Sequence, residues 1–286
     1  MKPLKPVFPV GNYTRNDTRP PRDRVTEEHE SVPITVRYGT LPFDPARHIV
    51  HVPVASFVVL DCDHCLRGLE ALGVRVDRSK GSSAIDIARN IRASDAIVEG
   101  FDSLLFIDSD MMFDPADAIR LFQSDEPVVA GVYAAKKLGN GRINCHFEEG
   151  TDEVRIGPWA DRLYPIRAVG AGFLRIKVSA LRHIAKTLDL PWCNMAERNA
   201  YPFFQPMVDI VEGVPCYFGE DYAFIRRCRQ AGLTPKVDTS FRLWHVGDYA
   251  YGIEEAAGEY LPRSRNLLYK LDDGGGSKVV PAPALE

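Results

Sequence analysis

The sequence lacks any run of about 20 apolar residues, the length that a helix needs to span a bilayer. Its first residues, Met1–Pro6, carry positive charge, but no apolar segment follows them, so the pattern of a secretory signal is also missing. From these two absences we expect a cytoplasmic protein without a membrane span.

An excess of basic residues is missing as well. The formal net charge of −4 gives no positive field for non-specific nucleic-acid binding, although it leaves open a nucleic-acid acceptor held in a local groove. The six cysteines are scattered, which is compatible with reduced thiols. Cys62 and Cys65 form one Cys-x-x-Cys that could serve a zinc or redox site. Since structural zinc needs four ligands and only Cys145-His146 could add to them, buried small residues at a helix start are the favoured interpretation.

What the sequence does contain is enough material for one large α/β domain with appended segments, at 286 residues and 45% hydrophobic content. Residues 1–32 show no hydrophobic period and are expected to form an extended tail or strap. Residues 256–286 are expected to form a C-terminal segment whose end, from Gly274 onward, is flexible.

Between these ends, strands and helices alternate. Apolar and β-branched runs predict four strands, and residues at helical spacing predict three helices between them. The strands are expected at 48–54, 74–76, 103–107 and 128–133, and the helices at 62–72, 83–99 and 115–123. This order predicts a mostly parallel central sheet flanked by helices, in which ligands bind beyond the carboxyl ends of the strands.

An acidic triplet, Asp108-Ser109-Asp110, directly follows the apolar strand 103–107. Two carboxylates that converge at the end of a strand repel each other unless a cation lies between them. Oxygen ligands of this kind suit Mg²⁺ or Mn²⁺, with substrate phosphates completing the coordination shell. The alternative is a solvated acidic loop in which Asp114 caps the next helix.

Four further segments carry polar or small residues in places that suit a ligand site, and each has a plain structural alternative. Asp86 and Arg89 could form a surface ion pair, and the glycine loop could be a tight turn. The acidic pair could favour a helix dipole, and the histidine could be a core residue. The segments are the Asp86-x-x-Arg89-Asn90 helix, the loop Gly170-Ala171-Gly172, the helix that begins Glu220-Asp221 and ends before Gly232, and His245 after an apolar strand.

Taken together and in this order, these segments resemble the GT-A glycosyltransferases, in particular their family-2-like group. The resemblance covers about residues 47–255, and Glu220-Asp221 with Arg227 and Gly232 looks like the E-D-x-x-x-x-x-R-x-x-x-x-G helix of that group. It implies a GT-A, Rossmann-like fold in a single domain. The nucleotide-sugar-binding half would span 47–133 and the acceptor half 134–255.

The resemblance also implies roles for individual residues. Asp221 would be the catalytic base, and Glu220 would position the base or the sugar. Asp108, Asp110 and His245 would hold Mn²⁺ or Mg²⁺, with Asp110 as the direct ligand and Asp108 reaching the donor ribose or a metal-bound water. The donor, a UDP- or GDP-sugar, would bind Asp86, Arg89, Asn90, Asp108, Ser109, Gly170, Ala171 and Gly172.

Two departures from the family pattern stand out. The first strand ends Val52-Pro53-Val54 without the usual Pro-Thr-x-Asn turn, and the segment 194–205 has no counterpart, so it is expected on the acceptor side, as a possible lid. The predicted activity is metal-dependent transfer of a sugar to a hydroxyl acceptor of unknown class, with inversion favoured. The alternatives are a sugar-phosphate nucleotidyltransferase, which usually has a glycine-rich loop after the first strand, and a non-catalytic nucleotide-sugar-binding protein of the same fold.

Overall fold

The computed structural model describes residues 43–80, 84–137, 142–157, 163–195, 198–240, 242–256, 266–271 and 277–282. The tail expected over residues 1–32 lies outside these ranges. Within them, no helix is both long and apolar enough to cross a membrane.

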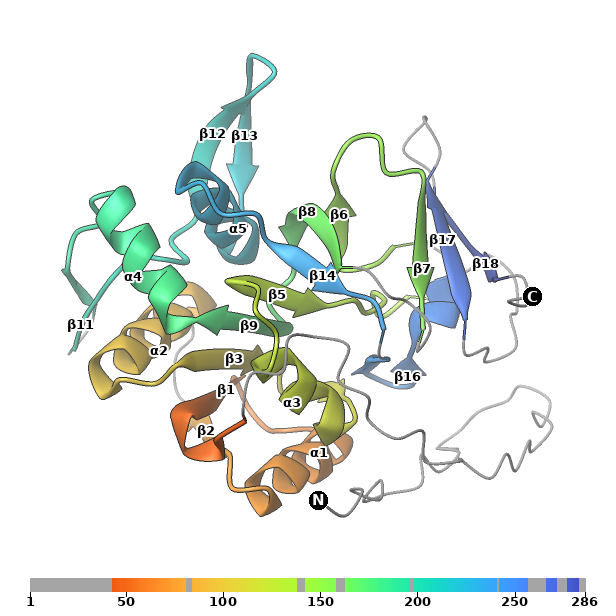
Figure 1. The fold of residues 1–286 in the computed structure, drawn as a ribbon, viewed down its shortest axis with the longest axis horizontal. Coiled ribbons are helices and arrows are strands. Elements are labelled where there is room, and N and C mark those ends of the chain that lie inside the picture. The colour runs from red at the N-terminus through yellow and green to blue at the C-terminus, as the bar shows by residue number, and fades with distance from the viewer. Residues whose placement is uncertain are drawn as a thin grey trace.

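An eight-stranded sheet runs through the centre of the molecule in the order β2-β1-β3-β9-β5-β14-β8-β6 (Figure 1). Six of these eight strands run in one direction, while β9 and β8 are reversed. The predicted α/β fold with a mostly parallel central sheet flanked by helices is therefore confirmed. The strands are β1 (His48–Val54), β2 (Arg75–Lys80), β3 (Ser103–Ile107), β5 (Val128–Gly131), β6 (Cys145–Phe147), β8 (Leu163–Val169), β9 (Phe173–Lys177) and β14 (Lys236–Asp238).

Helices cover both faces of this sheet, as the alternation of side chains along β3 shows. Leu104 and Phe106 join the core under three of the helices, and Leu105 and Ile107 join a second core under the other two. The first three helices are α2 (Ile85–Glu99), α4 (Val178–Thr187) and α5 (Glu220–Gln230); the other two are α1 (Leu60–Ala71) and α3 (Pro115–Phe122). Because β3 is buried on both faces, it is apolar without interruption from Leu104 to Ile107.

The helix ends follow the signals read from the sequence. Asp114 caps α3, since its Oδ1 accepts the backbone N–H of Ala116 at 2.9 Å, and Pro115 takes the first helical position. Gly100 ends α2 with a φ of 78°, a left-handed conformation that glycine adopts without strain. Gly232 follows α5 in the same region, with a φ of 78°.

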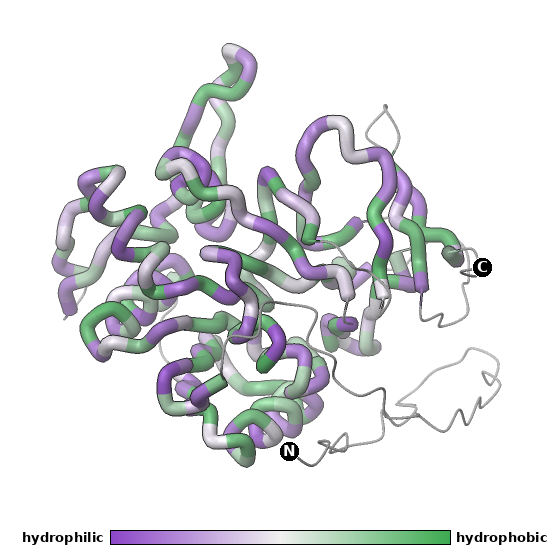
Figure 2. Tube along the Cα trace, viewed as in Figure 1, coloured by the Kyte–Doolittle hydropathy of each residue, from purple (hydrophilic) through white to green (hydrophobic). Residues whose placement is uncertain are grey.

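Four small sheets surround the central one. A hairpin projects from the body next to α5, and Figure 2 shows that hydrophobic and hydrophilic stretches alternate along it. The small sheets consist of β10 (Cys193–Met195) with β11 (Arg198–Ala200), the projecting hairpin β12 (Met207–Val211) with β13 (Val214–Phe218), β16 (Ala250–Tyr251) with β15 (Trp244–Val246) and β4 (Met111–Met112), and β18 (Ser277–Pro281) with β17 (Leu267–Leu271) and β7 (Glu153–Ile156). Two short 3-10 helices, Pro45–Arg47 and Ile253–Ala256, complete the described elements.

The C-terminal segment differs from the expectation of a flexible end from Gly274. Residues 277–281 form β18, which pairs antiparallel with β17, and Val279 is fully buried in the core. The glycine-rich stretch before it suggested flexibility, but the apolar pair Val279-Val280 after it supplies a strand that can be buried.

Candidate active site

The acidic triplet lies at the carboxyl end of β3, as predicted, and the glycine loop lies directly beside it. Strand β9 runs antiparallel to β3 with Ile107 opposite Phe173, which brings the residues before Phe173 next to those after Ile107. The backbone N–H of Asp108 donates to the carbonyl of Gly172 at 3.0 Å. Two segments more than 60 positions apart in the chain thus form one rim of the site.

Arg89 is the centre of an ion-paired cluster. Its side chain is 3% exposed, with Nη2 lying 2.8 Å from Oδ1 of Asp108 and Nη1 lying 2.8 Å from Oε1 of Glu220. Burial opposes the charge of Arg89, but Asp108, Glu220 and Asp221 outweigh it and raise the pKa of the guanidinium. Arg89 therefore pairs with Asp108 and Glu220 and does not form the surface ion pair with Asp86 that the sequence offered as an alternative. Asp86 lies half-buried in the first turn of α2.

Asp221 lies in the first turn of α5, beside Glu220. Burial, and then the neighbouring charge of Glu220, raise the pKa of Asp221 to about 6, although the carboxylate accepts the backbone N–H of Tyr222 at 2.7 Å. A Cβ placed on Gly170 would lie 3.6 Å from Oδ2 of Asp221. The carboxyl group with the raised pKa therefore faces the glycine loop.

The glycine loop owes its composition to this close approach. A Cβ placed on Gly172 would lie 2.5 Å from the Tyr133 hydroxyl and 2.9 Å from Oδ2 of Asp108, closer than a real Cβ can come to either. A Cβ on Gly170 would meet the same hydroxyl at 2.8 Å. Ala171 between them is buried. The sequence therefore needs glycine at both positions because site side chains press on the backbone.

Tyr133 is a site residue that the sequence analysis missed. Its hydroxyl accepts the backbone N–H of Gly172 at 3.2 Å, and its ring meets the His245 ring edge-on at a centroid distance of 5.3 Å. Burial, and then the charge of Asp108, raise the pKa of this phenol, so it stays protonated. Its place just past β5, at the same sheet edge as Asp108, is the signal that could have identified it.

Asp110 and His245 are brought together by a strand pair. Met111 of β4 lies opposite His245 of β15, and the backbone N–H of Val246 donates to the carbonyl of Asp110 at 2.7 Å. Nε2 of His245 consequently lies 3.5 Å from Oδ2 of Asp110. Nδ1 of the same ring lies 3.3 Å from the carbonyl of Ala134, so each ring nitrogen faces an oxygen that can accept a hydrogen bond.

This pair fits a divalent cation in part. Among the described residues, the buried Oδ1 of Asp110 has no hydrogen-bond partner, and Nε2 of His245 faces the same carboxylate. Within the described ranges, no group of three His, Cys, Asp or Glu side chains is arranged to hold a metal ion. Asp108, expected as a third ligand, has its Oδ1 on Arg89 instead. Two protein ligands remain, which is the usual number where substrate phosphates complete the shell of Mg²⁺.

Asn90 does not contribute its side chain to this edge. The residue is 2% exposed, and its Oδ1 accepts the backbone N–H of Phe204 at 2.6 Å. Arg227, the arginine of the glutamate-aspartate helix motif, donates to the carbonyl of Gln205 at 2.6 Å and to that of Phe203 at 3.2 Å. Phe203 and Phe204 are fully buried, so this part of the expected lid is fixed in the core.

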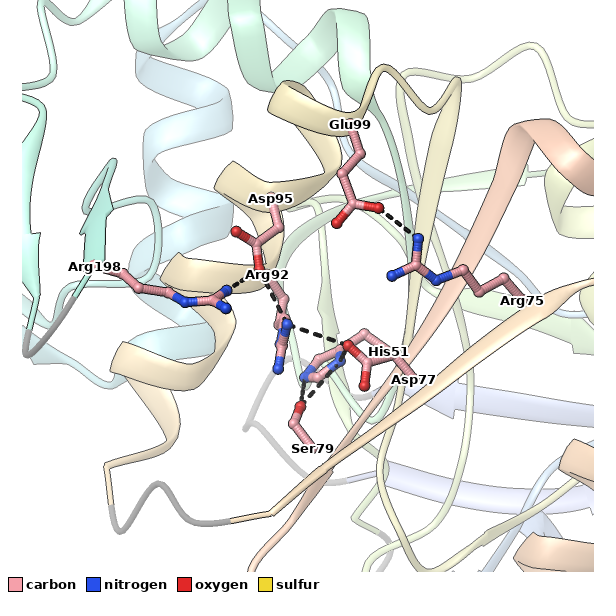
Figure 3. A network of polar contacts seen from close by, with 8 residues as sticks. All are labelled: His51, Arg75, Asp77, Ser79, Arg92, Asp95, Glu99 and Arg198. Atoms are coloured by element: carbon pink, nitrogen blue, oxygen red, sulfur yellow. Dashed lines mark hydrogen bonds and ion pairs between the residues drawn. The ribbon is translucent and has the colours of Figure 1, made fainter.

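A polar network attaches α2 to the edge of the sheet, and Figure 3 shows its members: His51, Arg75, Asp77, Ser79, Arg92, Asp95, Glu99 and Arg198. Arg92 of α2 lies 3.2 Å from Asp77 of β2 and 3.0 Å from Asp95. Nε2 of His51 lies 3.1 Å from Oγ of Ser79, but Nδ1 lies 3.7 Å from Asp77, beyond hydrogen-bond range. With His51 only 1% exposed, this group positions the helix that carries Arg89 and is no nucleophilic triad.

The Cys-x-x-Cys motif has a structural place under the triplet. The Cys62 thiol donates to the carbonyl of Asp108 at 3.5 Å, and the backbone N–H of Phe113 donates to the sulfur of Cys65 at 3.4 Å. Burial raises the pKa of Cys62 and raises that of Cys65 to about 11. Both cysteines are thus buried thiols that support the turn after β3. This agrees with the interpretation that they are small buried residues at the start of a helix.

Comparison with known proteins gives distant similarities. No family model and no curated protein matches the chain. Among solved structures, the chain is similar to A197 from STIV, with 15% identity and a TM-score of 0.45 over 84% of this chain and 97% of that one. It is similar to GalNAc-T7, crystallised with UDP, GalNAc and Mn²⁺, with 11% identity and a TM-score of 0.38 over 71% of this chain and 44% of that one. It is also similar to TarS 1–349 from S. aureus, with 14% identity and a TM-score of 0.35 over 68% and 59% of the two chains.

Proposed function

We propose that this chain is a metal-dependent glycosyltransferase of the GT-A type, which moves a sugar from a nucleotide-sugar donor to a hydroxyl acceptor with inversion. One observation carries the proposal. Asp110 and His245, the pair that would hold the cation, and the half-buried carboxyl group of Asp221, whose pKa is raised, flank the same tyrosine and glycine loop at the carboxyl edge of the sheet.

The cation side of the site supports departure of a nucleoside diphosphate. Asp110 and His245 would hold Mn²⁺ or Mg²⁺, which when bound neutralises the charge that grows on the leaving diphosphate. The strand pair β4–β15 holds the two ligands in place before the donor arrives. The buried Oδ1 of Asp110, which has no hydrogen-bond partner in the part of the chain that the structure describes, is an acceptor that a cation would satisfy.

The donor side of the site is built around Arg89. We assign donor contacts to Asp86, Asp108 and Ser109, with Asp108 reaching the ribose or a metal-bound water. Arg89 holds the Asp108 carboxylate from within the core, so its part is to position that group. Gly170, Ala171 and Gly172 would border the sugar, where the two glycines let the Tyr133 hydroxyl and the Asp108 carboxylate lie against the backbone.

Proton transfer falls to Asp221 in this scheme. The acceptor hydroxyl gives its proton to the Asp221 carboxylate while its oxygen bonds to the anomeric carbon and the bond from that carbon to the diphosphate breaks. Glu220 is anchored to Arg89 at 2.8 Å, so it positions α5 and leaves the base role to its neighbour. With a pKa of about 6, Asp221 is mostly ionised near neutral pH before the reaction. It is also basic enough to keep the proton that it takes from the acceptor hydroxyl.

A donor screen tests this proposal. UDP- and GDP-sugars are incubated with the chain, with and without Mn²⁺, and donor hydrolysis and transfer are followed by mass spectrometry. We expect Mn²⁺-dependent consumption of one donor, which the substitution Asp221→Asn abolishes while donor binding remains. Near-normal turnover of that variant would refute the base assignment. Pyrophosphate release from a sugar phosphate and a nucleoside triphosphate would instead identify a nucleotidyltransferase, and binding without any turnover would identify a non-catalytic protein.

A further inference from the structure

Lys136 contacts the cation site from a third segment of the chain. Its Nζ lies 2.5 Å from Oδ2 of Asp110, the same oxygen that Nε2 of His245 approaches at 3.5 Å. The lysine follows the β-bridge between Ala134 and Ile143, and its side chain is 35% exposed. The ammonium group therefore lies where the carboxylate would otherwise meet a bound cation.

The path of this side chain is shaped by Gly247, next to β15. A Cβ placed on Gly247 would lie 3.2 Å from Cδ of Lys136 and 3.9 Å from its Cε. The stem of the lysine thus lies across the glycine backbone, and most side chains at position 247 would have to push it aside. Since Gly247 comes two residues after His245, one short segment carries a cation ligand and guides the lysine.

An ammonium group and a divalent cation cannot share Oδ2 of Asp110. Two positive charges a few ångströms apart repel strongly at a partly buried position, so one must leave when the other binds. The lysine stem is flexible and partly exposed, so the ammonium can move while the two ligands stay on their paired strands. Once displaced, its three donors remain at the mouth of the site, where a diphosphate would lie.

We propose that Lys136 is an internal counter-ion of Asp110 that is exchanged for the divalent cation and then binds the donor diphosphate. The inference rests on the proposed function, because it takes Asp110 and His245 as the cation ligands. It makes cation and diphosphate binding mutually supportive, since each favours the displaced position of the lysine. An ordinary surface ion pair would have no such effect on either ligand.

Mn²⁺ binding without nucleotide tests the first half of the exchange. The full chain is titrated with Mn²⁺, and the free ion is followed by electron paramagnetic resonance. Lys136→Met removes the ammonium group that competes with the cation for Asp110. This variant is expected to bind Mn²⁺ roughly five- to tenfold more tightly than the unsubstituted chain, because the cation no longer has to break one partly buried ion pair. Lys137→Met, the same change one residue away on an exposed side chain, is the matched control and should stay within about twofold. Asp110→Asn should lose the binding.

Binding of a preformed Mn²⁺–pyrophosphate complex, measured by calorimetry, tests the second half. Lys136→Met is expected to bind this complex about tenfold more weakly than the unsubstituted chain, because a charge-assisted contact to the diphosphate is lost. Lys137→Met should again change little. Near-ultraviolet circular dichroism of each variant confirms that the fold is kept.

The two measurements separate this inference from the function that it rests on. Opposite shifts in Lys136→Met, tighter for Mn²⁺ and weaker for the complex, support the exchange. Shifts equal to those of Lys137→Met in both titrations overturn it while leaving the cation site intact. Absence of Mn²⁺ binding in both the unsubstituted chain and Lys136→Met overturns the cation site, and with it the metal dependence of the proposed function.

Discussion

The raised pKa of Asp221 predicts that the substitution Asp221→Asn stabilises the protein, and only above mildly acidic pH. The ordinary pKa of an aspartate is 3.8, and burial, followed by the charge of Glu220, raises that of Asp221 to about 6. Each pKa unit corresponds to about 1.4 kcal/mol, so the shift of about two units amounts to roughly 3 kcal/mol.

The sign follows from where the proton sits. Below pH 3.8 the group is protonated in both the folded and the unfolded chain. The neutral carboxyl group and the amide of asparagine then have similar effects on the free energy of unfolding. Between that pH and about 6 the unfolded chain loses its proton first, and the folded state becomes less favoured. Above about pH 6 the folded protein carries the full cost, which asparagine removes while its side-chain oxygen can still accept the Tyr222 N–H.

Equilibrium urea unfolding at a series of pH values from 4 to 8 measures this effect. The free energy of unfolding of Asp221→Asn minus that of the unsubstituted chain is expected to be near zero at pH 4 and to rise by roughly 3 kcal/mol at pH 7. Asp152→Asn, a change at an exposed carboxyl group, should show no such rise. Parallel stability curves for Asp221→Asn and the unsubstituted chain across this range would refute the reasoning, whatever the protein catalyses.

Three further changes have expected outcomes of other kinds. Gly172→Ala places a methyl group against the Tyr133 hydroxyl and should lower kcat at least about tenfold, with a smaller loss of stability measured as the melting temperature. An unchanged kcat would contradict the close approach of the tyrosine to the glycine. Arg175→Met leaves three carbonyl groups, two of them buried, without the guanidinium that now donates to them. It should cost roughly 3–5 kcal/mol in urea unfolding, whereas a loss below about 1 kcal/mol would show that the site relaxes. His245→Gln should weaken Mn²⁺ binding about tenfold or more in the paramagnetic-resonance titration, and equal affinity would remove it from the ligand pair.

The parts of the fold that the sequence predicts are those controlled by local signals. The apolar run from Leu104 to Ile107 predicts a strand buried on both faces, and the glycines at 100 and 232 predict two helix ends, because each signal acts within a few residues. The insertion of β9 between β3 and β5 carries no such signal. A reversed strand is chosen by which edges are free once the whole sheet assembles, and that depends on the entire chain.

The site follows the same division. That Asp110 and His245 belong together could be inferred only through the family resemblance, since the paired strands that bring them together, β4 and β15, lie more than 130 positions apart in the chain. The burial of Arg89 was missed because an arginine three residues after an aspartate on a helix reads equally well as a surface pair. Tyr133 and Lys136 were missed because one ends an apolar run and the other lies in a loop, and neither type is unusual there.

The placement of β9 has a consequence for how the chain reaches its folded state. Residues 47–133 contain β1, β2, β3 and β5 of the central sheet, but β3 and β5 do not pair with each other. They are joined by β9, which lies between them and follows β5 by more than 40 residues. A fragment limited to those residues would leave two strongly apolar strands, β3 and β5, with unpaired edges, which is a hazard for aggregation. A nascent chain therefore has to pass residue 177 before β3 and β5 can be joined, so this arrangement predicts slow, concerted folding and no stable fragment of residues 47–133.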